Sequence, residues 1–234
     1  MKRLFTFLST LFVLSSTTYA QENTFITRFL GIPIDGTKHE IIQKLKAKGF
    51  SDAGPYSNAD LIGEFNGVDV EIAAVTNNNK VYRIAVFDRY YSSETDIKIR
   101  FNKLCHQFEN NSKYDSACED QSISEAEDIS YEINVNSKRY QASFYQHMEG
   151  RTMFPETVDE YLLSLFTQEQ IDNPTEAEAA EINTLKEDFV KFSLLDMLSM
   201  THRSVWFMID NEHGKYRILM FYDNELNRAN GEDL

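Results

Sequence analysis

The chain has 234 residues, of which 42% are hydrophobic and 26% are charged. This composition excludes a disordered tail, and the length suits one large domain or two small ones. Lysine and arginine number 23 against 37 aspartates and glutamates, a net charge of −14 with neutral histidines. Such a negative field repels phosphate backbones and anionic headgroups, which argues against nucleic acid and acidic membranes as partners. It favours a basic protein or peptide or a metal ion, although solubility alone also explains an acidic surface.

The first twenty residues have the pattern of a secretory signal peptide. Lys2 and Arg3 precede an apolar run over residues 4–14 that is too short to span a bilayer, and cleavage is expected between Ala20 and Gln21. No cysteine follows the run, so a lipid anchor is not expected. The mature chain would have 214 residues, with 21 basic against 37 acidic residues and a net charge of −16. We therefore expect a periplasmic or extracellular protein without a membrane span.

The first expected helix begins at a capping box formed by Thr37 and Glu40, and it ends at Gly49. The strongest hairpin signal follows, because Asn66-Gly67 supplies the two positive φ angles of a type I′ turn. This turn joins a strand over residues 61–65 to one over residues 68–75, and the pairing places the apolar side chains on one face. The three asparagines at positions 77–79 then lead into a third strand, over residues 80–88.

A second helix is expected from the cap at Ser93 to about Asn110, with an apolar stripe that should lie on the sheet. Cys105 lies on this helix, and Cys118 is the second of the two cysteines in the chain. In an exported protein this pair predicts one disulfide, which would remove about 3 kcal/mol of unfolded-state entropy. The alternative, a nucleophilic Cys105 assisted by His106, is disfavoured because adjacent helical residues point about 100° apart.

Residues 119–128 contain five acidic residues and no base, which predicts a solvated linker rather than a calcium loop. Alternating apolar residues then predict a second hairpin, with strands over residues 129–135 and 140–144 joined at Asn136-Ser137. A short helix is expected over residues 158–166. A capping box at Thr175 and Glu178 begins a long helix that runs to about Met200, with an apolar stripe suited to packing on a sheet.

The last two strands, over residues 205–209 and 216–221, are apolar on both faces. This pattern is typical of central strands that are covered on each side. The end of the chain would then complete the core begun near its start. The sequence predicts a single α+β domain over residues 21–234, with a largely antiparallel sheet of about seven strands and helices packed on it.

Several short stretches resemble a group of uncharacterised exported proteins from gut-dwelling Gram-negative anaerobes. The matching residues are Gly31-Ile32-Pro33-Ile34-Asp35-Gly36, Lys48-Gly49-Phe50, Gly63, Phe65, Gly67, Phe221-Tyr222-Asp223-Asn224 and Asn227. Similar domains resemble the β-lactamase-inhibitory-protein-like arrangement, in which helices pack on an antiparallel sheet. The resemblance implies an exported binding or inhibitory module, and it supplies no catalytic residue. Asp115-Ser116-Ala117 also resembles the O-glycosylation pattern of such bacteria, which makes Ser116 a candidate acceptor.

Motifs for catalysis, nucleotide binding and metal binding are absent from the sequence, so no catalytic residue, metal ligand or cofactor is predicted. Tyr90 and Tyr91 stand between a strand and a helix cap, where burial is not required, and they are candidate binding aromatics; packing over the sheet edge is the alternative. We expect a non-enzymatic module that binds a protein or peptide. A hydrolase built on converging carboxylates and an immunity-type protein that masks a cationic toxin stay open as alternatives.

Overall fold

The computed structural model describes residues 25–148 and 155–229, and the predicted signal peptide lies outside this part of the chain. The helices and strands are β1 (Arg28–Phe29), β2 (Ile32–Pro33), α3 (Lys38–Lys46), β3 (Ser51–Asp52), β4 (Leu61–Phe65), β5 (Val68–Asn77), β6 (Lys80–Asp88), α4 (Glu94–Glu109), β7 (Tyr114–Ser116), α5 (Ile129–Asn136), β8 (Gln141–Gln146), α6 (Val158–Leu163), α7 (Gln168–Asp172), α8 (Glu176–Ser199), η4 (Met200–His202), β9 (Ser204–Glu212), β10 (Lys215–Asp223) and η5 (Glu225–Asn227). Within the described residues, no helix combines the length and the apolarity needed to cross a bilayer.

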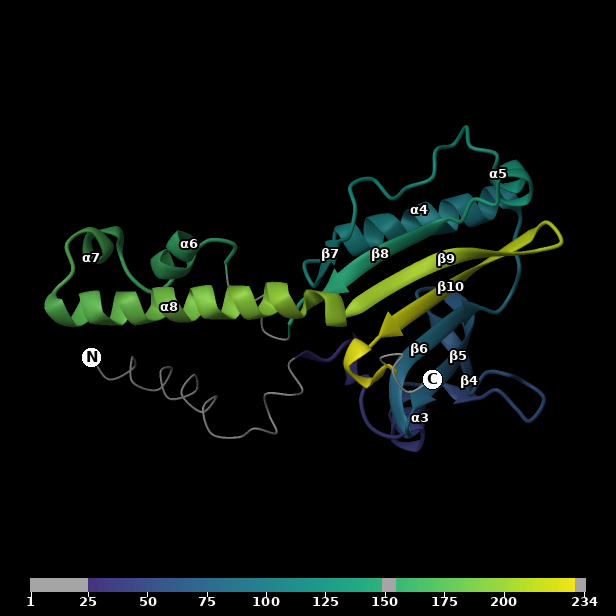
Figure 1. Ribbon diagram of the computed structural model, residues 1–234, viewed down its shortest axis with the longest axis horizontal. Helices are drawn as coiled ribbons and strands as arrows, with labels where there is room; N and C mark the ends of the chain where they lie inside the picture. The colour runs from purple at the N-terminus through teal and green to yellow at the C-terminus, as the bar shows by residue number, and fades with distance from the viewer. Residues whose placement is uncertain (1–24, 149–154, 230–234) are drawn as a thin grey trace.

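The fold is α+β, as expected, and its main sheet has eight antiparallel strands in the order β3-β4-β5-β6-β10-β9-β8-β7 (Figure 1). Strands β1 and β2 form a separate two-stranded ribbon. The last two strands of the chain, β9 and β10, occupy the middle of the main sheet, so the predicted central position is confirmed. Strand β10 pairs with β6 on one side and with β9 on the other, which joins the early and late parts of the chain.

The first hairpin has the predicted register. Leu61 pairs with Ile72, and Phe65 pairs with Val68 across the turn. Asn66 and Gly67 have φ angles of 53° and 76°, the positive values that a type I′ turn requires. Local turn chemistry therefore determines which face of β4 and β5 meets the core.

One face of the sheet carries the core, to which α3 and α4 also contribute buried side chains. Phe101 and Phe108 of α4 pack against Phe207 of β9, with ring centroids 5.0 and 5.9 Å apart. On the opposite face the cross-strand neighbours Trp206 and Phe221 stack at 4.2 Å and are only half-buried. The expectation that both faces of the central strands are covered was wrong, because the core helices pack on a single face.

The predicted strand over residues 129–135 was wrong, since this segment forms helix α5. The carboxylate of Asp128 accepts a hydrogen bond from the Tyr131 N–H at 2.8 Å and caps the helix, and Ser137 ends it in a left-handed conformation. A period of two cannot keep one helical face apolar, so Ile129 is buried while Tyr131 and Val135 are exposed. Strand β8 pairs instead with β7 and β9.

The acidic segment over residues 119–128 is irregular, as expected, but it is fixed along α4 rather than free in solvent. The side-chain amide of Asn102 exchanges two hydrogen bonds with the backbone of Ile123, at 2.7 and 2.8 Å, and Ile123 is buried. The Lys98 ammonium donates to the carbonyl oxygens of Glu125 and Glu127, both at 2.8 Å. These contacts hold the backbone of the segment against the helix. The Glu127 carboxylate accepts hydrogen bonds from Lys138 and Tyr140, whereas Glu119 and Glu125 are exposed.

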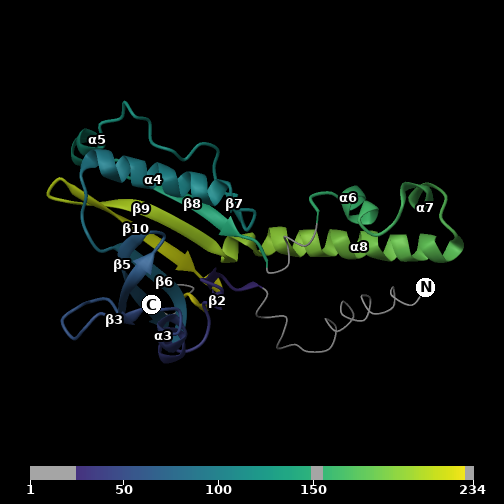
Figure 2. The ribbon, with the colours of Figure 1, turned by 180° about the vertical axis from the view of Figure 1, so that it is seen from behind.

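The long helix α8 begins at the predicted capping box, where Thr175 and Glu178 bond reciprocally. The expectation that α8 packs on the sheet was wrong. Its main contacts are with α6, α7 and η4, and the helix extends away from the body beyond the strand ends (Figures 1 and 2). We call residues 155–200, which include α6, α7 and α8, the arm.

Because the core lies on one face of the sheet, truncating two neighbouring side chains of β9 should have different effects on the free energy of unfolding. Phe207→Ala should lower the free energy of unfolding by about 3–5 kcal/mol, because the cavity would open among three aromatic rings. Met208→Ala, on the half-buried face, should cost less than about 1.5 kcal/mol. Urea denaturation of both variants measures the two values, and equal losses would contradict the assignment of the faces.

Candidate interaction surface and its anchor

A buried charge network holds the arm to the sheet. Arg203, which follows η4 and is fully buried, donates from Nε to the Gln146 carbonyl oxygen at 2.6 Å and from Nη1 to the Ser199 hydroxyl at 2.7 Å. Its Nη2 bonds the Asp196 carboxylate at 2.6 Å. Because Gln146 belongs to β8 and Asp196 to α8, one guanidinium connects the central sheet to the projecting helix.

His147 extends this network to the edge strand β7. Its Nδ1 lies 3.1 Å from one Asp196 carboxylate oxygen, and its Nε2 lies 3.2 Å from an Asp115 oxygen. The Met148 N–H donates to the other Asp196 oxygen at 2.9 Å. Since carboxylates occupy both ring nitrogens, His147 is poorly placed to act as a general base on an external substrate. Its role in this geometry is to link α8 to β7.

The surroundings of Asp196 favour its charged form. Burial alone would raise the pKa of this carboxyl, but the hydrogen bonds from His147 and Met148 and the charge of Arg203 outweigh burial and lower the pKa below its ordinary value of 3.8. Removing one partner of such a buried ion pair destabilises the fold, because the remaining charge stays desolvated. The junction between arm and body is therefore rigid while both partners are charged.

The last turns of α8 expose an apolar surface. Leu194, Met197 and Leu198 follow Val190 by four, seven and eight residues, and the exposed fractions of the four side chains are 48%, 61%, 62% and 60%. This spacing places them on one side of the helix. The other side carries Asp196 at the anchor and Phe189, whose ring stacks on Tyr161 of α6 at 5.6 Å. We call these four residues the apolar stripe.

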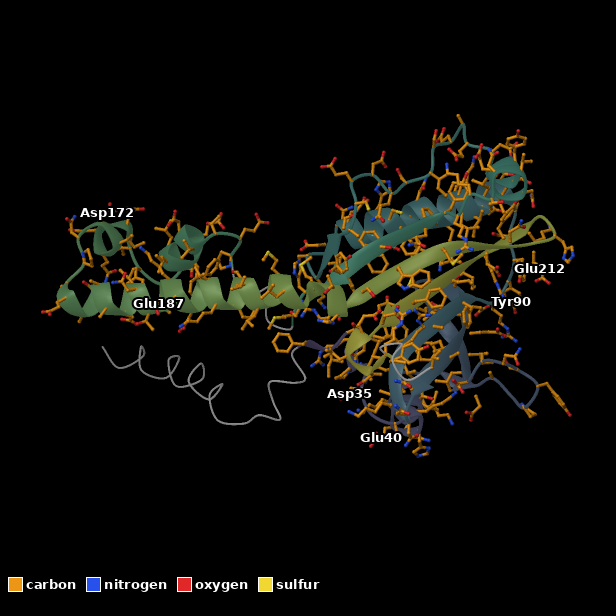
Figure 3. The ribbon with its side chains drawn as sticks, in the orientation of Figure 1. Asp35, Glu40, Tyr90, Asp172, Glu187 and Glu212 are labelled. Carbon is orange, nitrogen blue, oxygen red and sulfur yellow. The ribbon has the colours of Figure 1, made fainter. Side chains whose placement is uncertain are left out.

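Acidic residues dominate the arm. Residues 155–200 contain eleven aspartates and glutamates and two lysines, for a net charge of −9. Both lysines are in the middle of α8, and Lys191 lies 3.7 Å from Glu187 and 3.6 Å from Asp188. Figure 3 shows Asp172 and Glu187 on this part of the molecule. The arm therefore carries −9 of the net charge of −14, and the apolar stripe lies within this acidic segment.

Tyr90 lies at the opposite end of the molecule from the arm (Figure 3). Tyr90 is 64% exposed, which fits the candidate role of a binding aromatic. The Tyr91 hydroxyl donates to Glu212 at 2.6 Å, and the Arg217 guanidinium lies 4.7 Å from the Tyr91 ring centroid. Tyr91 is therefore packed against the β9–β10 hairpin, and the structure does not bring the pair to the apolar stripe.

The expected Cys105–Cys118 disulfide is not formed in the structure. Cys105 is buried in α4, Cys118 is exposed, and both thiols are free. Burial raises the pKa of the Cys105 thiol to about 12, which keeps it protonated and unreactive. Ser116 is exposed on β7, where its hydroxyl donates to the Cys118 carbonyl oxygen at 2.7 Å. Glycosylation of Ser116 stays a prediction, as does cleavage between Ala20 and Gln21, which lie outside the described residues.

Comparisons with known proteins add no relatives: no family model, no curated protein and no solved structure matches this chain. Within the described part of the chain, no group of three or more histidine, cysteine, aspartate or glutamate side chains is arranged to hold a metal ion. Sequence analysis found the acidic balance but missed the apolar stripe, because it expected the apolar side of α8 to lie on a sheet. The side that it expected runs through Ile182, Leu185, Phe189, Phe192, Leu195 and Leu198, so Leu198 is the one residue shared with the apolar stripe.

The anchor predicts a dependence of stability on acid pH. Asp196 has a lower pKa in the folded state than in the unfolded chain, so its contribution is complete above about pH 4 and is lost as the pH falls through the folded value. Between pH 5 and pH 2, the protection of α8 amides against hydrogen exchange should therefore decline more steeply in the wild type than in Asp196→Asn. Parallel profiles for the two proteins would contradict the role assigned to Asp196.

Proposed function

We propose that this chain is an exported, non-enzymatic binding module that docks a basic protein or peptide on its arm. The observation that carries the proposal is the apolar stripe of α8, exposed within a segment of net charge −9. Large apolar side chains gathered on a surface and surrounded by charge are typical of protein interaction sites. The arm is also available on several sides, because α8 extends beyond the sheet.

The net negative charge of the arm determines which kind of partner it attracts. Two copies of the arm side by side would bring net charges of −9 together, so pairing with a second copy is opposed by repulsion. Anionic membrane surfaces are repelled for the same reason. A partner with lysine or arginine around an apolar face gains from both features, because its charges are attracted at long range and its apolar residues cover the stripe. An immunity-type protein that masks a cationic toxin is one member of this class.

The hydrolase alternative receives less support. It needs two carboxyl groups facing each other across a cleft about 5–9.5 Å wide. A cavity of about 720 Å³ in the described part of the chain has no aspartate or glutamate among its lining residues. The predicted signal peptide and the resemblance to exported binding modules agree with a docking role outside the cytoplasm.

The docking proposal is tested with a helical peptide of about 20 residues that has leucine on one face and lysine on the other. Fluorescence anisotropy should detect its binding to the full chain, and Leu194→Ser/Leu198→Ser should weaken binding by about tenfold or more, because two leucines lose their burial in the complex. Ile99→Ser is the matched control, since Ile99 is 63% exposed on α4, away from the arm. Binding should also weaken between 50 and 500 mM salt.

Three outcomes would contradict the docking proposal. The first is equal weakening by the Ile99 control, and the second is equal binding of a peptide in which glutamate replaces lysine. The third is a dimer of the protein alone, seen by analytical ultracentrifugation and abolished by the Leu194/Leu198 variant, because it would assign the stripe to a second copy.

The Cys105–Cys118 bridge belongs to the same proposal, because an exported protein meets an oxidising environment. Protein secreted to an oxidising compartment should have no titratable thiol after unfolding without reductant, whereas protein made in a reducing cytosol should have two. Cys118→Ser should lower the free energy of unfolding by about 3 kcal/mol in the secreted protein only. Two free thiols per secreted chain would overturn the bridge and leave the docking proposal untouched.

A further inference from the structure

The face of the main sheet opposite α3 and α4 carries large apolar side chains. An antiparallel sheet with its core on one side commonly has a polar outer face. Here the outward positions of the central strands hold half-buried apolar residues outside the core cluster, namely Phe87, Trp206, Met208, Leu219 and Phe221. The Phe221 ring lies 6.3 Å from the Phe87 ring and 4.2 Å from the Trp206 ring, so aromatic contacts cross three strands. We call the outer surface of β5, β6, β10 and β9 the open face.

The charged groups of the open face largely neutralise one another. The Arg83 guanidinium binds the Asp223 carboxylate at 2.5 and 2.7 Å. The Arg217 guanidinium lies 3.0 Å from the Asp210 carboxylate, and Glu71 of β5 adds one negative charge. The chain as a whole has a net charge of −14. A partner of the open face therefore gains mainly from apolar contact rather than from charge.

Small and large side chains occupy different halves of the open face. In one row across the strands, Ala73 pairs with Ala85, Ala85 pairs with Phe221, and Phe221 pairs with Trp206. Two small side chains on β5 and β6 thus lie beside two large rings on β10 and β9. The surface is low on one side of the seam between β6 and β10 and high on the other.

This arrangement is complementary to itself. A two-fold axis along the strands, between β6 and β10, would place the two rings of one copy over the two alanines of the other. The same axis would place Asp223 of one copy over Arg83 of the other, because these two residues pair across the same strands. Sheets that pack face to face keep their strand directions within about 30° and interdigitate their inner side chains, which this pairing allows.

The area of the sheet is sufficient for such a contact. Six strands from β4 to β8, spaced by about 4.8 Å, and three rows of outward residues, spaced by about 6.8 Å, cover about 30 by 20 Å. Two copies would then bury about 1,200 Å² in total, at the lower end of the range for specific interfaces. An interface of this size supports a reversible dimer with a dissociation constant on the order of micromolar.

We propose that the open face is the contact between two copies of this chain, related by a two-fold axis along the strands between β6 and β10. A basic peptide gains little there, because Asp210 and Asp223 already have cations as partners. The contact is separate from the arm and does not depend on the docking function, because none of its residues belongs to residues 155–200.

The fluorescence of Trp206 tests the dimer directly, because Trp206 is the single tryptophan of the chain and lies on the open face. On dilution of the full chain from about 200 to about 0.5 µM, the emission should shift to longer wavelength as water reaches the indole. Analytical ultracentrifugation should show the change from dimer to monomer over the same range. Higher salt should strengthen the dimer, because it screens the repulsion between two acidic chains, whereas binding of a basic peptide to the arm should weaken.

A matched pair of variants tests the position of the contact. Ala73→Lys should weaken the dimer by about tenfold or more, because the new side chain occupies the low half of the open face and brings a charge into an apolar interface. Ala126→Lys is the control, since Ala126 is exposed in the segment that lies along α4. It makes the same change in charge and should alter the dissociation constant less than about twofold. Circular dichroism checks that both variants fold.

The proposal is overturned by a monomer at every concentration, by equal weakening in the two variants, or by a dimer whose formation leaves the Trp206 emission unchanged. A dimer that is lost in Leu194→Ser/Leu198→Ser but kept in Ala73→Lys would also overturn it and would place the contact on the arm. Should Ala73→Lys fail to fold, the emission shift of the unmodified chain still decides.

Discussion

The pairing of β10 with β6 is the constraint on which the rest of the structure depends. Strand β6 continues the hairpins formed by the first third of the chain, and β10 brings β9, β8 and β7 with it. Next to this seam, the Arg83 guanidinium of β6 binds the Asp223 carboxylate of β10 at 2.5 and 2.7 Å. The Trp206 indole donates to the same carboxylate at 2.9 Å. Without this pairing the sheet would be two smaller sheets, each with an open edge.

The central position of β9 and β10 was predicted from their apolar residues on both faces, although the core helices cover only one of these faces. The register of the first hairpin was predicted from local turn chemistry, because Asn66-Gly67 fixes which residues of β4 and β5 pair. The predictions were wrong where contacts between distant elements determine the structure. Residues 129–135 alternate like a strand, but the cap at Asp128 and the pairing of β8 with β9 turn them into α5. An alternating pattern of seven residues does not distinguish a strand from a short helix when other strands already occupy the sheet.

The position of α8, which forms the candidate site, also depends on contacts that a sequence pattern does not reveal. Sequence analysis expected its apolar side, which includes Leu185, Leu195 and Leu198, to pack on the sheet. The decisive interaction is instead the buried contact of Arg203 with Asp196 and with the Gln146 carbonyl oxygen, which fixes the end of the helix at the rim of the sheet. A buried guanidinium is stable only with all of its partners in place, and no sequence pattern reveals that its partners come from both β8 and α8. The exposed stripe is a consequence of this anchor.

Charge is unevenly distributed in this molecule. Residues 155–200 carry a net charge of −9, whereas the whole chain of 234 residues carries −14. A chain that was acidic only for solubility would have no reason to concentrate this charge on a projecting segment. His147 bonds Asp196 at the root of the arm and Asp115 on β7, so a change at this imidazole would act directly on the anchor of α8. This contact gives the sheet edge a physical route to the arm.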